Sequence, residues 1–144
     1  MKLTKKISIK ELDTILIAYS ALVFKDFETI RKVFDKKGNF LGMGYDNFIS
    51  FLSADFEKQD KEALFNSNEM LLDNRFIDMA SHPGMICYMF NSSKPKILFI
   101  PSSNSGKISE VKFSRYCIAQ WKLENLVRMF EQEDNDYLDL IFNN

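Results

Sequence analysis

The high phenylalanine content limits the folds that this sequence can adopt, because 14 of its 144 residues are Phe, beside five Tyr and one Trp. So many large apolar side chains are better explained as a core than as a ligand-binding surface. Hydrophobic residues make up 46% of the chain and charged residues 27%, which is ordinary globular usage and excludes wholesale disorder. A chain of this length fits one core better than two. The sequence therefore predicts one globular domain, residues 1–144, with an aromatic core.

The first helix has the clearest local signals. Ser8 to Glu11 has the S-x-x-E form of a capping box, directly before an apolar run. Apolar residues then recur at intervals of three and four, which predicts a helix from about Ile9 to Phe24. The positions are Ile9, Leu12, Ile15, Leu16, Tyr19, Leu22 and Val23.

Residues 27–42 allow two interpretations. The apolar spacing would continue as a helix, whereas Gly38-Asn39 between two short apolar runs is typical of a tight hairpin turn. The hairpin is the favoured interpretation, because Gly and Asn both tolerate the positive φ that such a turn requires.

Three further helices are predicted before residue 81. Asp46 is a candidate N-cap for the first, which carries Phe48, Ile49, Leu52 and Phe56 on one face. Residues 61–65 contain good helix formers and predict the second. Asn68 would cap the third, over residues 69–80. Pro83 follows closely, and proline disfavours helix in the residue before it.

The second half of the chain changes to strand signals. Short apolar runs at residues 85–90, 96–100 and 108–115 predict three strands, the first two paired antiparallel because their link is too short for a crossover. Helical spacing returns over residues 116–131, and this helix should bury Trp121 on a sheet face formed partly by Val111 and Phe113. Asp134 or Asp136 is a candidate cap for a last helical turn. The predicted fold is α+β, with N-terminal helices, an antiparallel sheet of about three to five strands, and a C-terminal helix packed on it.

Catalytic side chains are scarce. The chain has one histidine, His82, two cysteines, Cys87 and Cys117, and no recognisable catalytic or phosphate-binding motif. A small hydrolase-like enzyme using His82, with Cys87 or Ser81, is the alternative hypothesis, and it requires these side chains to lie within hydrogen-bond reach. A protein that is not an enzyme is the favoured interpretation. Both cysteines are interpreted as packing residues of a reducing compartment, which predicts a cytoplasmic location.

No metal ion or cofactor is predicted. Asp134-Asn135-Asp136 is similar to the start of a calcium loop, but the glycine and the final glutamate that such a loop needs are missing. One histidine and two scattered cysteines do not make a zinc site. Magnesium would need acids that converge from separate elements, and the acids available for this also fit as caps or solvated residues. These acids are Asp35, Asp46, Asp73 and Asp78.

The composition argues against membranes and nucleic acids as partners. No apolar run approaches the roughly 18–20 residues that cross a bilayer, and the basic start is not followed by the apolar region of a signal peptide. The net charge of −1 is far from the basic footprint of nucleic-acid-binding domains. A weak nucleic-acid-binding domain stays open as an alternative, because several lysines could contact phosphates. These are Lys2, Lys5, Lys6, Lys10, Lys94, Lys96 and Lys107.

The C-terminal residues 124–144 are acidic, with six Asp and Glu side chains against Arg128 alone. Such a face can attract a basic partner, although a solvated helix end would have the same composition. The predicted binding residues are Glu131, Glu133, Asp134, Asp136 and Asp139, with Tyr137 as an aromatic anchor. Small bacterial immunity proteins, which cover the active site of a toxin nuclease, have a similar profile of compact size, no cofactor and no catalytic residues. The favoured function is therefore a toxin inhibitor that binds a basic partner protein.

Overall fold

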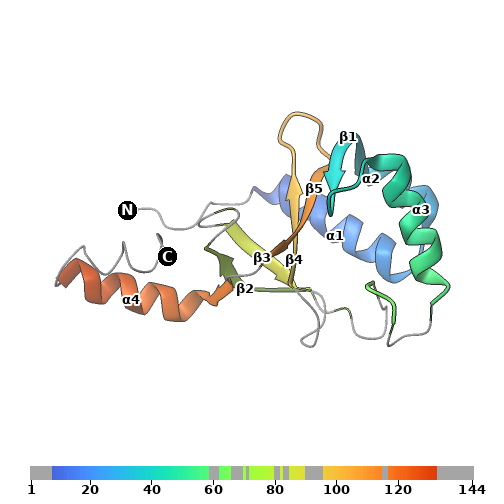
Figure 1. Ribbon diagram of the computed structural model, residues 1–144. Helices are drawn as coiled ribbons and strands as arrows, with labels where there is room; N and C mark the ends of the chain where they lie inside the picture. The colour runs from blue at the N-terminus through green and yellow to red at the C-terminus, as the bar shows by residue number, and fades with distance from the viewer. Residues whose placement is uncertain are drawn as a thin grey trace.

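The computed structural model describes residues 8–58, 62–65, 70, 72–79, 82, 85–89, 96–114 and 117–132. These residues form an α+β fold of helices and two small sheets, as predicted (Figure 1). The elements are α1 (Ile9–Val23), α2 (Phe27–Val33), β1 (Phe34–Phe40), α3 (Tyr45–Phe56), β2 (Asp73–Asp78), β3 (Met85–Met89), β4 (Lys96–Pro101), β5 (Ile108–Ser114), β6 (Cys117–Ala119) and α4 (Gln120–Gln132).

The two sheets differ in strand direction. The first has the order β1-β5-β4, with β1 parallel and β4 antiparallel to β5. The second has the order β3-β2-β6 and is antiparallel throughout. The predicted strands at residues 85–90, 96–100 and 108–115 are confirmed as β3, β4 and β5. Their predicted pairing is wrong, because β3 and β4 lie in different sheets, and the first sheet is mixed and not purely antiparallel.

The capping box and the first helix are confirmed. The backbone N–H of Glu11 donates to Ser8 Oγ at 3.1 Å, and the Ser8 hydroxyl donates to the Glu11 carboxylate at 3.1 Å. This reciprocal pair satisfies N-terminal groups that the helix itself leaves unbonded. Ile15, Ala18 and Leu22 are fully buried on the side of α1 that faces α2 and the first sheet.

The hairpin predicted for residues 27–42 is wrong. Asp26 accepts a hydrogen bond from Thr29 N at 3.2 Å and caps α2, and a single strand, β1, follows it. Gly38 lies inside that strand, where a Cβ atom would come within 2.5 Å of the Ser109 carbonyl oxygen. The glycine therefore allows β1 to approach β5 closely, and the turn comes later, at Leu41 and Gly42, which have positive φ.

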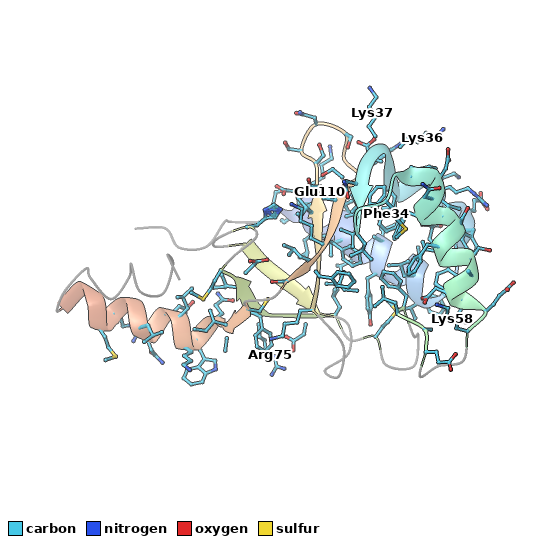
Figure 2. The ribbon with its side chains drawn as sticks, in the orientation of Figure 1. Phe34, Lys36, Lys37, Lys58, Arg75 and Glu110 are labelled. Atoms are coloured by element: carbon cyan, nitrogen blue, oxygen red, sulfur yellow. The ribbon has the colours of Figure 1, made fainter. Side chains whose placement is uncertain are left out.

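Aromatic rings fill the core between α3 and the first sheet. Phe48 of α3 stacks on Phe40 with ring centroids 4.9 Å apart and meets the edge of Phe34 at 5.3 Å. Figure 2 shows Phe34 among the side chains between these elements. The predicted helix is confirmed as α3, but Gly44 is its N-cap and Asp46 lies in its first turn.

The helices predicted at residues 61–65 and 69–80 are wrong where the structure describes them. Residues 62–65 are turn and loop, and β2 occupies residues 73–78. β2 lies between β3 and β6, so the sheet bonds its backbone on both sides. Tertiary pairing of this kind overrides the weak helix propensity of a short segment.

The C-terminal helix α4 packs on the second sheet, through contacts with β2 and β6. It begins at Gln120, after strand β6, and extends away from α1, α2 and α3 (Figure 1). Leu123 is buried against the sheet, whereas Trp121 is 66% exposed. Two positions correspond to about 200° around a helix, so these side chains lie on opposite faces. The predicted burial of Trp121 is wrong, as is that of Phe113, which is 44% exposed beside the fully buried Val111.

Trp121→Ala should therefore have little effect on stability. Loss of a mostly exposed side chain typically changes the free energy of unfolding by about 1 kcal/mol or less. Leu123→Ala, on the buried face of the same helix, should cost about 2–5 kcal/mol. Urea unfolding followed by circular dichroism measures both, and equal losses in the two variants would contradict the placement of Trp121.

Candidate functional site

The predicted acidic site is mostly outside the described residues. Glu131 lies in the last turn of α4, while Glu133, Asp134, Asp136, Tyr137 and Asp139 all fall in the range 133–144. The sequence similar to a calcium loop and the predicted last helical turn lie in the same range. This site therefore stays a prediction.

His82 contacts a carboxylate but not a described nucleophile. Its Nε2 atom is buried and lies 3.4 Å from Glu110 Oε2, in a geometry that makes no hydrogen bond within the described part of the chain. Lys112 Nζ lies 3.9 Å from the same carboxylate oxygen. Ser81 is outside the described residues, and His82 lines neither of the two hollows described below. Among the described residues this arrangement gives His82 a charged neighbour, and the enzyme hypothesis stays a prediction.

A buried polar cluster joins the two sheets. The Ser114 hydroxyl, at the end of β5, donates to Asp78 Oδ2 of β2 at 2.8 Å and lies 3.0 Å from Cys117 Sγ of β6. Asp78 is fully buried. Cys117 is disulfide-bonded, and Cys87 is the only other cysteine of the chain. The interpretation of Cys117 as a free packing thiol is therefore wrong, and a sulfur in a disulfide is not a thiolate nucleophile.

The acids considered for a magnesium site serve separate local roles. Asp35 accepts from Lys37 N at 2.9 Å. Asp73 binds the Arg75 guanidinium at 2.6 Å, and hydrogen bonds from Arg75 lower the pKa of that carboxyl group. Within the described ranges, no group of three or more His, Cys, Asp or Glu side chains is placed to hold a metal ion.

The solvent-facing side of α1 and its C-cap carry four large exposed apolar side chains. Ile9 and Phe24 are each 81% exposed, and Leu16 and Ile17 are about half exposed between them. We call this surface the α1 outer face, and it consists of Ile9, Asp13, Leu16, Ile17, Ser20 and Phe24. Part of it is hollowed into a groove of about 460 Å³, which the first residues of α2 help to line. Because the opposite side of α1 forms the core, this helix is apolar on both sides while the described residues cover only one.

The charges around this groove are negative. Asp13 and Asp26 line it, and no basic side chain does so among the residues described there. Asp26 accepts hydrogen bonds from the backbone and hydroxyl of Thr29, which lower the pKa of its carboxyl group and keep it ionised. The adjacent Lys25 is directed elsewhere, with Nζ 3.3 Å from the Phe56 carbonyl oxygen.

A second hollow, of about 1110 Å³, is lined by four basic side chains. Its lining comes from the end of α2, from β1, from the start of α3 and from the loop before β5. We call it the basic hollow, and its residues are Arg31, Lys32, Lys36, Gly44, Tyr45, Asp46, Asn47 and Lys107. Of the described lysines that the sequence marked as possible phosphate contacts, namely Lys10, Lys96 and Lys107, only Lys107 lies here.

Sequence reasoning missed both surfaces. A signal for the α1 outer face was present, since Ile15, Leu16 and Ile17 are consecutive and cannot all lie on one side of a helix. For the basic hollow the signal was partial, because Arg31, Lys32 and Lys36 lie within six positions of the chain, whereas Lys107 comes from a distant loop.

No helix among the described residues is both long and apolar enough to cross a membrane. Comparison with protein family models, with curated proteins and with solved structures gives no match to this chain.

Proposed function

We propose that this protein is a non-catalytic binding protein, and that the α1 outer face docks on a partner protein with a basic surface. The observation that carries this proposal is the row of exposed apolar side chains from Ile9 to Phe24. Large apolar side chains exposed together on one surface are unfavourable in water, and on soluble proteins such patches, rimmed by polar residues, commonly mark an interaction site.

The shape of this face favours a protein over a small molecule. Ile9 and Phe24 are 15 positions apart, which corresponds to about 22 Å along a helix. A row of that length suits a helix or strand of a partner, with Leu16 and Ile17 at its centre and Phe24 as an exposed aromatic anchor. Asp13 and Asp26 beside the groove favour a partner with basic residues around an apolar ridge.

The most concrete form of this function is toxin neutralisation. A toxin nuclease has a basic active site, and an acidic inhibitor would both speed the encounter and imitate the phosphates of the substrate. Glu131 and the acids up to Asp139, with Tyr137, are proposed as a second contact region. Immunity to a bacterial toxin would follow from such an inhibitor, and the support for it is the charge pattern alone.

The redox state of the cysteines indicates the compartment in which the protein acts. The sequence predicted a cytoplasmic location from reduced thiols, whereas the disulfide at Cys117 favours an oxidising compartment. Thiol labelling of the denatured, unreduced protein distinguishes these two cases.

A charge-inserting variant tests the docking face. Leu16→Lys with Ile17→Lys places two cations at the centre of the α1 outer face, where both side chains already contact solvent. We expect a partner protein isolated by its binding to the natural protein to bind the variant at least about tenfold more weakly, which corresponds to a loss of about 1.4 kcal/mol of binding free energy. The reason is that apolar contact is lost and that the new lysines meet the basic surface of the partner. Titration calorimetry with the purified partner measures the change.

Met129→Lys is the matched control, because Met129 is similarly exposed on α4, away from this face. It should leave the affinity unchanged. Equal binding by the natural protein and the double variant would contradict docking through the α1 outer face.

A further inference from the structure

We infer that the basic hollow binds a ligand that carries several phosphate charges. This site is separate from the α1 outer face and does not depend on the proposed function. Arg31 and Lys32 reach it from the last turn of α2, Lys36 from β1, and Lys107 from the loop before β5.

The charge of the lining is the main support. Four basic side chains and one acid, Asp46, surround the hollow, in a chain whose net charge is −1. Like charges that face one solvent-filled space repel one another, and a bound anion removes that repulsion. The concentration of positive charge at this place is therefore local, and does not follow from the composition of the chain.

The four cations are not held by strong internal ion pairs. Lys32 lies 3.3 Å from Glu28, but both side chains are more than 70% exposed, and such a pair contributes little. Among the described residues no ion pair involves Arg31 or Lys36. The Arg31 guanidinium lies 5.5 Å from the centre of the Phe27 ring, and this contact orients it without using its hydrogen-bond donors in ion pairs. Hydrogen bonds from the Lys37 backbone N–H and from Ser105 are the main causes that lower the pKa of the Asp35 carboxyl group, and the charge of Lys107 adds to them.

The walls of the hollow are fixed relative to each other. The Tyr45 hydroxyl donates to the Arg31 carbonyl oxygen at 2.7 Å and ties the start of α3 to the end of α2. The first turn of α3 also lines the hollow, and its N-cap, Gly44, provides no side-chain hydrogen bond. This uncapped turn adds a favourable electrostatic field for an anion, as a secondary contribution to that of the cations.

A phosphate group matches this lining better than a carboxylate does. A phosphate monoester carries about −1.5 to −2 charges and three acceptor oxygens, so a diphosphate can engage several cations at once, which a single carboxylate cannot. The hollow, at about 1110 Å³, exceeds what one such group fills. Small-molecule sites usually have about 300–1,000 Å³, so there is room for a ligand of nucleotide size.

Calorimetric titration of the full chain with inorganic pyrophosphate tests the inference. We expect binding that weakens as salt is raised, and shifts of the amide resonances of residues 44–47 in nuclear magnetic resonance spectra. Arg31→Gln with Lys36→Gln should weaken pyrophosphate binding at least about tenfold, since two of the four cations are removed.

Lys37→Gln provides the matched control. Lys37 is the neighbour of Lys36 on β1, and it is also exposed (Figure 2). Its side chain does not line the hollow. This variant should bind pyrophosphate as the natural protein does. Equal losses in both variants, or no pyrophosphate binding by the natural protein at low salt, would overturn the inference.

A second titration distinguishes free phosphate compounds from a nucleic-acid backbone. A ten-nucleotide oligothymidylate that binds more tightly than pyrophosphate, and loses affinity in the Arg31→Gln and Lys36→Gln variant, would identify phosphodiesters as the natural source. Pyrophosphate binding without oligothymidylate binding would identify a small phosphate compound. Loss of binding at the α1 outer face affects neither titration, so the two proposals can fail separately.

Discussion

Phe48→Ala is expected to lower the free energy of unfolding by about 3–5 kcal/mol, which is a large share of the stability of a small domain. Phe48 is fully buried, and its ring contacts three others, with centroids 4.9 Å from Phe40, 5.3 Å from Phe34 and 6.4 Å from Phe65. Truncation removes these contacts and leaves a cavity that the surrounding rings, held by β1 and by the turn at Phe65, cannot fill.

Phe24→Ala is the matched control for this variant. It is the same chemical change, but Phe24 is 81% exposed at the C-terminal end of α1, so the loss should stay within about 1 kcal/mol. Urea unfolding followed by far-ultraviolet circular dichroism measures both variants. A Phe48→Ala midpoint close to that of Phe24→Ala would show that the rings do not form the core.

Local signals were sufficient for the elements that depend mainly on their own sequence. The capping box at Ser8 and the apolar spacing that follows it predicted α1, and the structure has both. The apolar runs between turn residues predicted β3, β4 and β5. Each of these signals lies within a few residues of the element that it specifies, so no knowledge of distant partners was needed.

The misassigned elements depend on partners that are distant in sequence. β1 pairs with β5, where Phe40 lies opposite Val111. This pairing cannot be predicted from the sequence of residues 27–42 alone. β2 becomes a strand because β3 and β6 bond both of its edges. The prediction that Trp121 is buried was wrong for a different reason. Its helix was predicted from residue 116, whereas residues 117–119 form β6 and α4 begins at Gln120. The face of α4 that meets the sheet is set by Leu123, and helical spacing alone did not decide between the faces of Trp121 and Leu123.

The candidate surfaces were less predictable than the fold. The α1 outer face could be predicted only if it were known which side of this helix is covered, because the apolar spacing places the exposed Leu16 in the same series as the buried Ile15 and Leu22. The basic hollow is assembled from segments up to 76 positions apart, between Arg31 and Lys107. Charge counts along the sequence pointed to the two ends of the chain, whereas folding brings Lys107 to the cluster of Arg31, Lys32 and Lys36.

Asp55→Ala is expected to have the second largest effect on stability, at about 3 kcal/mol or more. Asp55 is only 1% exposed, and its two carboxylate oxygens accept hydrogen bonds from Leu64 N at 2.7 Å and from Phe65 N at 2.8 Å. Hydrogen bonds to a charged group contribute about 1.5–3 kcal/mol each, and removal of the acceptor leaves two backbone donors without their partner. These bonds also hold the Phe65 ring against Phe48 in the core.

Two further variants separate the hydrogen bonds from the charge. Asp55→Asn keeps one acceptor oxygen and turns an N–H donor toward the other backbone donor, so its loss should be smaller than that of Asp55→Ala but still clear. Asp46→Ala removes an exposed carboxylate from the same helix and should change stability by about 0.5 kcal/mol or less. Urea unfolding gives the free energies, and hydrogen exchange reports the two amides directly. The expected loss of stability depends on the Asp55 carboxylate as the acceptor for both amides. If the amides of Leu64 and Phe65 stay protected from hydrogen exchange in Asp55→Ala, another group holds this turn and the prediction is contradicted.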